Sequence, residues 1–369
     1  MKITDVKTHY IRIPLKKPYH GGTYTIDSRA TIIIQIITDQ GIIGEAFAGD
    51  QRTNGSQICQ LIHGEYKNLI TNEDPTAIHK IWSRLFNVAI KATDKRTHLE
   101  ALSLIDVTLW DILGKISRQP VYKLLGGHHN RIPIITIGGY YQEGKDPSLL
   151  EKEVKTYIEQ EMAGIKLKVG RTDIDEDIER VKIVREAAGE DFVIAVDANM
   201  AWTPRQAIRF AKEAEKYNVA WLEEPAQWYN FAQNMHIIKQ ATTIPLTAGQ
   251  SELTRGGCKQ LMDREAIDIC NADSSLCGGI SEWMKIAHLA ELYNVSMAHH
   301  EEWQISMHLL AGITHGTYAE CFADPDRDPL FQSLVVNKRI HRGYIELPSR
   351  PGLGLELDTE FIRRHEVKT

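Results

Sequence analysis

A short strand-like segment, AGIKLKVG at residues 163–170, places two lysines close together. Alternate residues of a strand point to the same face, so Lys166 and Lys168 share one face and the aliphatic residues share the other. In a half-exposed sheet both amines would simply face water. The alternative is a site that needs two amines side by side, because a neighbouring positive charge lowers the pKa of a lysine that serves as a base.

Polar residues also end the β-rich runs that follow. Together with KLK, the endings VDAN, WLEEP, TAGQSE, CNAD, AHHEE and YAE belong to seven successive predicted strands. Their ionisable or amide residues are Asp197, Asn199, Glu223, Glu224, Gln250, Glu252, Asp273, His299, His300, Glu301 and Glu320. Each residue alone could be a helix cap or a solvated charge. The repetition favours one shared site, because chance would scatter such residues over both strand ends.

The residue types in this series suit metal-assisted proton transfer. Three adjacent strands end in oxygen-bearing side chains, those of Asp197, Glu223 and Gln250. Their oxygens would converge on one point, and hard oxygen ligands suit Mg²⁺. Asp273 and His300 follow neighbouring strands, where the carboxylate could orient and charge the imidazole. A proton next to a carboxylate is very weakly acidic, and a divalent metal stabilises the enediolate that its removal creates. The sequence therefore predicts removal of such a proton by an amine or an imidazole.

The elements that must position these residues form a regular repeat. Eight β-rich runs alternate with amphipathic helices, at residues 132–137, 165–169, 193–196, 219–222, 244–246, 267–270, 295–298 and 318–321. Thr203 and Pro204 predict the start of one of the helices. The repeat is typical of a (β/α)8-type barrel, in which the chemistry lies at the carboxyl ends of the strands. A doubly wound open sheet is the alternative.

The two ends of the chain follow other patterns. Residues 1 to about 50 predict antiparallel strands, with a turn at 39–41, and residues 99–115 carry a helical apolar stripe. After about residue 322 the repeat stops. The turn-rich tail is expected to fold back onto the N-terminal domain.

Composition excludes several classes of function. The 369 residues carry a formal net charge of −6 without a basic stripe, so a nucleic-acid partner is not expected. No apolar run approaches the roughly 18 residues that would cross a membrane. The five cysteines are scattered without a CxxC pair, which indicates neither disulfides nor zinc but a reducing, cytoplasmic location. Nucleotide binding is disfavoured because P-loop and GxGxxG motifs are absent. We expect a homo-oligomer.

Taken together, the motifs resemble the mandelate racemase subgroup of the enolase superfamily. The capping domain of that family and its junction with the barrel resemble the stretches IITDQGIIGEA, SLIDVTLWDILGK and PVYKLLGG. The barrel motifs of the family match, in order and spacing, KLK, VDAN, WLEEP, NAD…CGG and HH…HLLAG. The resemblance covers nearly the whole chain. It implies an α/β fold, a modified TIM barrel (β/α)7β at 126–322, with an α+β capping domain at 1–125 that a C-terminal segment at 323–369 completes.

The resemblance also implies catalytic roles. Lys168 would be one acid–base catalyst, and Lys166 would lower its pKa and contact the substrate carboxylate. His300, paired with Asp273, would act on the opposite face, and its offset of 20 from Glu320 favours it over the preceding histidine. Glu320 would hydrogen-bond the substrate carboxylate or the enediolate.

The remaining expected site residues bind the metal or the substrate. The resemblance implies that Asp197 and Glu223 bind Mg²⁺. The substrate contacts expected beside Lys166 and Glu320, from the barrel strands, the barrel rim and the polar capping loop YHGGTYTI, are Asn199, Tyr140, Tyr141, His20 and Tyr24.

One position departs from the pattern of the family. Gln250 stands where the family usually has a third acidic ligand. A carboxamide oxygen can still bind Mg²⁺, with weaker binding and a more electrophilic metal expected. Glu252, two residues later, could substitute if the backbone stays extended.

Several reactions share this machinery. The expected substrate is a small carboxylate, and the expected reaction is dehydration of a sugar acid, an aldonate or aldarate, by a hydro-lyase. Cycloisomerisation and racemisation or epimerisation are the alternatives within the same chemistry. A Schiff-base aldolase would also use a barrel lysine but would need no carboxylate cluster. An inactive binding homologue is the non-enzyme alternative, and Gln250 is its only support.

Overall fold

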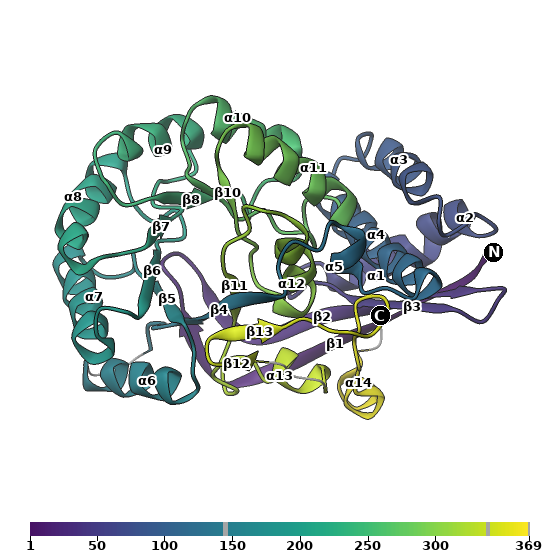
Figure 1. Ribbon diagram of the computed structural model, residues 1–369, viewed down its shortest axis with the longest axis horizontal. Coiled ribbons are helices and arrows are strands. Elements are labelled where there is room, and N and C mark those ends of the chain that lie inside the picture. The colour runs from purple at the N-terminus through teal and green to yellow at the C-terminus, as the bar shows by residue number, and fades with distance from the viewer. Residues whose placement is uncertain (143–146, 337–339, 368–369) are drawn as a thin grey trace.

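Two units make up the computed structural model, which describes residues 1–142, 147–336 and 340–367. A three-stranded antiparallel sheet with helices forms a cap, and a ring of parallel strands with outer helices forms a barrel (Figure 1). The cap sheet has the order β1-β2-β3, with bounds β1 (Ile3–His20), β2 (Thr25–Thr38) and β3 (Ile43–Phe47). The predicted turn at 39–41 is confirmed: the Thr38 amide donates to the Ile42 carbonyl at 3.1 Å, and Gly41 takes a φ of 76°.

A long central helix joins the cap to the barrel. The cap helices are α1 (Gly55–Leu61), the π-helix η1 (Ile62–Tyr66), α2 (Lys67–Ile70), α3 (Ile78–Ala89), α4 (Lys95–Ser117) and α5 (Val121–Leu124). Helix α4 contains the predicted stripe at 99–115 and packs against β3, α3 and the barrel helix α11 (Gly279–Leu292). Because it is covered on several sides, α4 buries polar as well as apolar residues.

All eight predicted barrel strands are present. They are β4 (Arg131–Gly138), β5 (Gly164–Lys168), β6 (Val193–Asp197), β7 (Trp221–Glu223), β8 (Leu246–Ala248), β9 (Ile269–Cys270), β10 (Ser296–Met297) and β11 (Ala319–Cys321). Neighbouring strands pair in parallel from β4 to β10, and β11 pairs with β4. A bridge between Met297 and Gly316 closes the ring. The open-sheet alternative is therefore wrong.

Helices cover the outside of the ring. They are α6 (Pro147–Glu159), α7 (Ile174–Ala188), α8 (Pro204–Ala214), α9 (Phe231–Lys239), α10 (Arg255–Asp263), α11 and α12 (Trp303–Gly312). The predicted start of α8 is confirmed. Thr203 is the N-cap and forms a reciprocal capping box with Gln206, and Pro204 is the first helical residue. Strand β8 begins two residues later than expected. Pro245 has no N–H for the ladder, so regular pairing starts after it.

The two-sided burial of β5 answers the question that its sequence raises. Every residue of this strand is buried, with Lys166 0% and Lys168 3% exposed. Both faces of a parallel barrel strand are covered, one by helices and one by the barrel interior. Helix α6 contacts β5 from outside. The two lysines therefore belong to the barrel interior and are not solvated.

The hairpin between β1 and β2 extends over the mouth of the barrel (Figure 1). The Thr23 hydroxyl donates to the backbone carbonyl of Asn199 at 2.9 Å. A Cβ added at Gly22 would lie 2.5 Å from the Ala198 carbonyl oxygen and 2.7 Å from that of Val169. Only glycine allows this approach, so the hairpin is fitted directly onto the ends of β5 and β6.

The C-terminal segment contacts both units. It contains α13 (Phe331–Leu334), β12 (Ile340–His341), β13 (Tyr344–Glu346) and α14 (Thr359–His365). Strand β13 pairs antiparallel with the start of β4, whereas α14 packs against β1 of the cap. The tail therefore lies between the barrel and the cap and joins them.

A buried arginine joins the same three parts of the chain. Arg29 of β2 is 1% exposed and forms ion pairs with Glu301 at 3.0 Å, Asp50 at 3.2 Å and Asp328 at 3.8 Å. Its guanidinium also lies over the Phe322 ring, 4.5 Å from the centroid. One cation thus holds carboxylates from the cap, the barrel and the C-terminal segment together.

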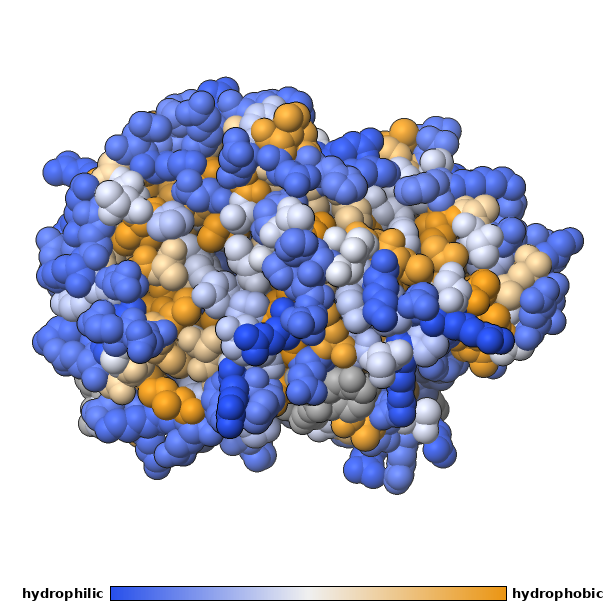
Figure 2. All heavy atoms as spheres, viewed as in Figure 1, coloured by the Kyte–Doolittle hydropathy of each residue, from blue (hydrophilic) through white to orange (hydrophobic). Residues whose placement is uncertain are grey.

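The surface is predominantly hydrophilic at its edges. Figure 2 shows hydrophilic side chains around the rim of the molecule and hydrophobic side chains inside the ring of outer helices. Among the described residues, none of the helices combines the length and the apolar character needed to cross a bilayer.

Candidate active site

Strand register brings the first set of site residues together. Lys168 pairs with Asp197 across β5 and β6, and Asp197 pairs with Glu223 across β6 and β7. All three stand at the carboxyl ends of their strands, where barrel strands carry functional side chains. One row of the barrel thus contains an amine and two carboxylates.

Both lysines form ion pairs inside the barrel. The Lys166 Nζ lies 3.0 Å from Glu223 Oε1 and 2.8 Å from Glu320 Oε2. The Lys168 Nζ lies 2.5 Å from Asp197 Oδ2. The side chains of these five residues are at most 3% exposed. Lys166 therefore has two acidic partners, and Lys168 has a separate one.

These pairs change the expected proton affinities. Burial lowers the pKa of Lys168, but the adjacent Asp197 carboxylate, with further contributions from Tyr140 and Tyr24, outweighs burial and holds that pKa well above its ordinary value. The sequence argument expected a lowered Lys168 pKa beside a second ammonium and a metal ion and did not include this ion pair; the lowered pKa stays a prediction for the metal-bound enzyme. Burial raises the pKa of Glu223 to about 8, against the opposing charge of Lys166.

One carboxylate oxygen and one amide oxygen beside Asp197 have no hydrogen-bond partner in the described part of the chain. Among the described residues, Glu223 Oε2 and Asn199 Oδ1 are buried without a hydrogen-bond partner. Asp197 Oδ1 accepts from the Asn199 amide at 2.9 Å, which fixes the orientation of its carboxyl group. Unpartnered buried oxygens are costly unless another group binds them. This oxygen-rich donor set fits a hard divalent cation.

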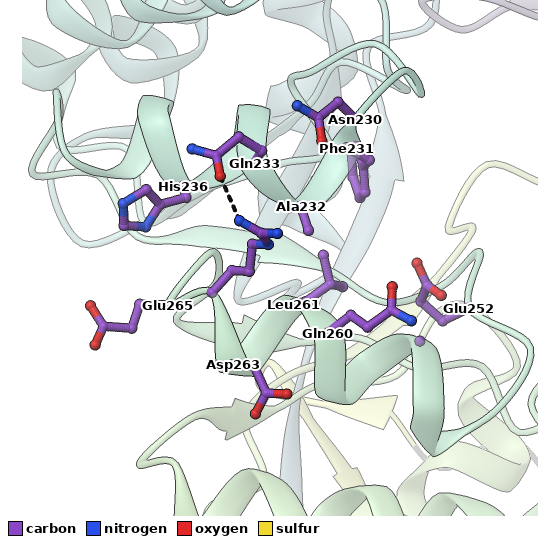
Figure 3. A pocket seen from close by; sticks show the side chains of 12 residues that line it. Asn230, Phe231, Ala232, Gln233, His236, Glu252, Gln260, Leu261, Asp263 and Glu265 are labelled. Atoms are coloured by element: carbon purple, nitrogen blue, oxygen red, sulfur yellow. Dashed lines mark hydrogen bonds between the residues drawn. The ribbon is translucent and has the colours of Figure 1, made fainter.

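The structure separates the two residues expected to compete as third ligand. Gln250 lines the same cavity as Lys168 and Asn199. The backbone turns after it, because the Glu252 amide donates to the Gly249 carbonyl at 3.0 Å. Glu252 consequently lines a different cavity of about 850 Å³ between α9 and α10, shown with Gln260 and Asn230 in Figure 3. The extended backbone that Glu252 would need is not formed.

Glu224 is a site residue that the sequence argument did not select. It is 3% exposed, lines the cavity and accepts a hydrogen bond from Gln250 Nε2 at 2.7 Å. Burial raises its pKa to about 7, and the nearby Asp197 carboxylate adds to the shift. The second glutamate of WLEEP was its only signal, and that position could equally have been solvated.

The expected histidine–aspartate pair is formed. His300 Nδ1 lies 3.0 Å from Asp273 Oδ2, and Asp273 Oδ1 accepts from the Ser275 amide at 2.7 Å. Burial lowers the pKa of His300, but Asp273 and Glu301 outweigh it and raise that pKa to about 9. His300 is 26% exposed at its side chain and lines the cavity, as expected for the reactive member of the pair.

The neighbouring histidine has a structural role. His299 Nε2 accepts from the Ser274 amide at 3.0 Å, and its Nδ1 lies 3.3 Å from the Glu301 carbonyl. Ligand atoms of Asp273, His299 and Glu302 all lie within 4.8 Å of one another. Both nitrogens of His299 are already hydrogen-bonded, so it offers a metal no free lone pair. This cluster is distinct from the oxygen donors around Asp197.

Glu302 is a second lining residue; the sequence indicated a place on the barrel rim for it but did not include it among the predicted site residues. It is 5% exposed and lines the cavity, and neither carboxyl oxygen has a hydrogen-bond partner among the residues described. Burial raises its pKa well above the ordinary range, and the charges of Asp273 and Glu301 add to the effect. A neutral carboxyl group at this wall can donate a hydrogen bond.

One polar cavity of about 350 Å³ joins these groups. Lys168, His300, Asn199 and Gln250 reach it from the barrel, and Tyr24 reaches it from the capping hairpin. Its further charged lining residues are Arg29, Asp50, Arg52, Arg96, Glu100, Glu224, Asp273, Glu301 and Glu302. A cavity of this size and polarity suits a small hydroxylated acid.

Other expected substrate contacts lie outside this lining. Tyr140 is 1% exposed behind Tyr24, with their hydroxyls 3.4 Å apart. His20 and Tyr141 pair through their backbones, each amide donating to the other's carbonyl at 3.0 Å. The Tyr141 hydroxyl donates to Asp177. These residues support the hairpin and the start of α7.

Known proteins share both units of this fold. The mandelate racemase/muconate lactonizing enzyme N-terminal domain matches residues 3–126, and the enolase C-terminal domain-like family matches residues 149–361. Arabinonate dehydratase of Saccharolobus solfataricus is 31% identical, over 92% of this chain and 91% of its own. The 3,6-anhydro-alpha-L-galactonate cycloisomerase of Streptomyces coelicolor is 28% identical over 99% of both chains.

A solved structure agrees with these matches. A mandelate racemase/muconate lactonizing enzyme from a marine actinobacterium, determined in complex with magnesium, superposes with a TM-score of 0.93. It is 38% identical and the match covers 100% of this chain and 99% of that one. The family matches, at residues 3–126 and 149–361, together span most of the chain. The chain therefore belongs to the mandelate racemase/muconate lactonizing enzyme family of the enolase superfamily.

Proposed function

We propose that this enzyme removes the proton next to the carboxylate of a sugar acid and dehydrates the resulting enediolate. The observation that carries the proposal is the meeting of Lys168 and the His300–Asp273 pair in one polar cavity beside the Asp197 and Glu223 carboxylates. Acid–base groups from two separate sets of strands can serve both steps, because one accepts the proton and the other protonates the leaving hydroxyl.

Each residue has a distinct role in the proposal. Lys168 and His300 exchange protons with the substrate, and Asp273 orients His300. Glu320 and Lys166, held 2.8 Å apart, form the base of the site and contact the substrate carboxylate. Tyr24 covers the substrate from the capping hairpin. Asn199 orients Asp197 through hydrogen bonds at 2.9 and 3.0 Å.

The oxygen donors fit Mg²⁺. Asp197 and Glu223, with Gln250 beside them, would hold the ion. When bound, Mg²⁺ would stabilise the negative charge that develops on the substrate carboxylate.

Dehydration is favoured over cycloisomerisation by the cavity and by relatives. The charged lining suits an open-chain polyhydroxylated acid, and arabinonate dehydratase is among the similar proteins. Cycloisomerisation is the second candidate, because a cycloisomerase aligns with 99% of the chain. Both reactions begin with the same proton removal.

A substrate screen tests the proposal. Aldonates and aldarates incubated with enzyme and Mg²⁺ should give a 2-keto-3-deoxy acid from at least one member of the panel. Running the screen in deuterated solvent would also reveal silent exchange or epimerisation. Neither product nor deuterium incorporation from any acid would refute the proposed chemistry.

Removal of the metal should abolish turnover. A chelator is expected to inactivate the enzyme and added Mg²⁺ to restore it, because the enediolate charge is unsupported without the ion. Steady-state rates before and after each addition provide the measurement. Full activity in metal-free buffer would contradict the assigned metal role.

The cellular setting is a further part of the proposal. The substrate class points to catabolism of carbohydrate acids, and the five buried cysteines suit a reducing cytoplasm. We also propose a homo-oligomer and retain the division into 1–125, 126–322 and 323–369. Light scattering of the purified protein would measure the oligomeric state.

A further inference from the structure

The third position of the oxygen donor set contains an unusual pair. Gln250 occupies it, but the Gln250 amide nitrogen donates to Glu224 Oε2 at 2.7 Å. The Ser251 hydroxyl contacts the other Glu224 oxygen at 3.4 Å. An amide and a hydroxyl from the loop after β8 thus hold a carboxylate that comes from the end of β7.

The backbone also fixes Glu224 beside the other donors. It follows Glu223 directly and takes a φ of 39°, a left-handed conformation that is uncommon outside glycine. Its amide donates to the Thr247 carbonyl at 2.9 Å, and its carbonyl accepts from the Met200 amide at 2.7 Å. Both bonds tie this turn to the neighbouring strand ends, and the side chain lines the cavity with Asn199 and Gln250.

Charge balance agrees with a third acidic donor at this point. In their ionised forms, Asp197, Glu223 and Glu320 pair with the ammonium groups of Lys166 and Lys168. Glu224, which lines the cavity with Lys168, adds a fourth carboxylate against these two ammonium groups. The excess of two negative charges equals the charge of one divalent cation. With Gln250 and no Glu224, the excess would be a single negative charge.

We propose that Glu224 supplies the third carboxylate for the divalent cation, and that Gln250 is the positioning residue that holds it there. This inference rests on the metal site of the proposed function. It explains how the chain tolerates an amide where the family pattern has an acid. The negative charge has moved from the end of β8 to the end of β7.

Magnesium titrations of the full-length protein test the inference without using activity. Calorimetry would measure the Kd of Mg²⁺ for the wild type, Glu224→Gln, Gln250→Met and the exchange variant Glu224→Gln/Gln250→Glu. Loss of the carboxylate should weaken binding by at least about tenfold, and loss of the amide donor should also weaken it, within the range of about 10–100-fold known for residues that orient metal ligands. The exchange variant should bind close to the wild type, because it keeps both the charge and the hydrogen bond.

Glu252→Gln is the matched control. It removes a partly buried carboxylate from the same loop, but that carboxylate faces the outer cavity between α9 and α10 (Figure 3). Its Mg²⁺ affinity should equal that of the wild type. Wild-type affinity in Glu224→Gln would overturn the inference. If that variant does not fold, the exchange variant decides, and a failure to restore binding there would overturn it too. Absence of Mg²⁺ binding to the wild type would instead refute the proposed metal site.

Discussion

Replacing Lys168 with alanine should slow exchange of the substrate α-proton by about 10³-fold or more, the scale of a positioned acid–base group. The prediction applies to the substrate face that Lys168 serves. His300→Asn should have the same effect on the other face, because asparagine keeps the size and polarity but cannot take up a proton. Proton NMR in deuterated solvent measures exchange for each variant, with either stereoisomer of the substrate.

Comparing α-proton exchange and product formation in the two variants distinguishes the base from the acid. Loss of exchange in one variant and of product formation in the other would assign which group acts as base and which as acid. Circular dichroism would confirm that both variants are folded, and Glu252→Gln serves as the active control. Unchanged exchange in both Lys168→Ala and His300→Asn would refute the site assignment.

Replacing Arg29 with methionine should destabilise the protein by about 3–5 kcal/mol, the cost of leaving buried charges without their partner. Three carboxylates from three parts of the chain depend on this guanidinium. Methionine fills much of the same volume, so the loss reports charge more than packing. Chemical denaturation at neutral pH measures the free energy of unfolding.

The effect of Arg29→Met should depend on pH. Burial raises the pKa of Glu301, but Arg29 and His300 outweigh this and lower it from 4.5 to about 2. A depressed folded-state pKa stabilises the protein above the unfolded value of 4.5, and this stability is lost as the pH falls toward 2. Burial raises the pKa of Asp328, a second partner of Arg29, to about 6. The deficit of the variant should therefore be largest at neutral pH and shrink as the pH falls from about 6 toward 2, because the carboxylates that lost Arg29 take up protons.

Arg185→Met is the control for charge. Arg185 is also buried, 7% exposed, but its guanidinium donates to backbone carbonyls, including those of Tyr217 at 3.0 Å and Phe192 at 2.9 Å. Its replacement should destabilise the protein with little pH dependence. An equal pH dependence for both variants would show that the Arg29 ion pairs are not its source.

The sequence was sufficient to predict the barrel and most of the site because these features repeat. Seven strand ends with polar residues identify one face, and register then places Lys168 beside Asp197 and Asp197 beside Glu223. The His300–Asp273 pair follows from the same rule. Such contacts depend on strand order, which the alternation of strands and helices already indicates.

Other features depend on single turns or on packing that no periodic pattern encodes. The turn at residues 249–252 directs Glu252 outward, although spacing alone allowed it to share a face with Gln250. Glu224 and Glu302 could be recognised as site residues only once their burial was known. The ion pair of Lys168 with Asp197 is another contact that spacing alone did not reveal, and the lowered Lys168 pKa stays a prediction for the metal-bound site.

The contact of the capping hairpin with Asn199 has a thermodynamic consequence. The Thr23 hydroxyl donates to the Asn199 carbonyl, and the Asn199 amide groups donate to the Asp197 carboxylate, so a single residue separates the hairpin from a proposed metal donor. A substrate that enters under the hairpin and a cation at Asp197 therefore act on one connected network. Linkage requires such an effect to be mutual, so each should strengthen binding of the other by the same factor.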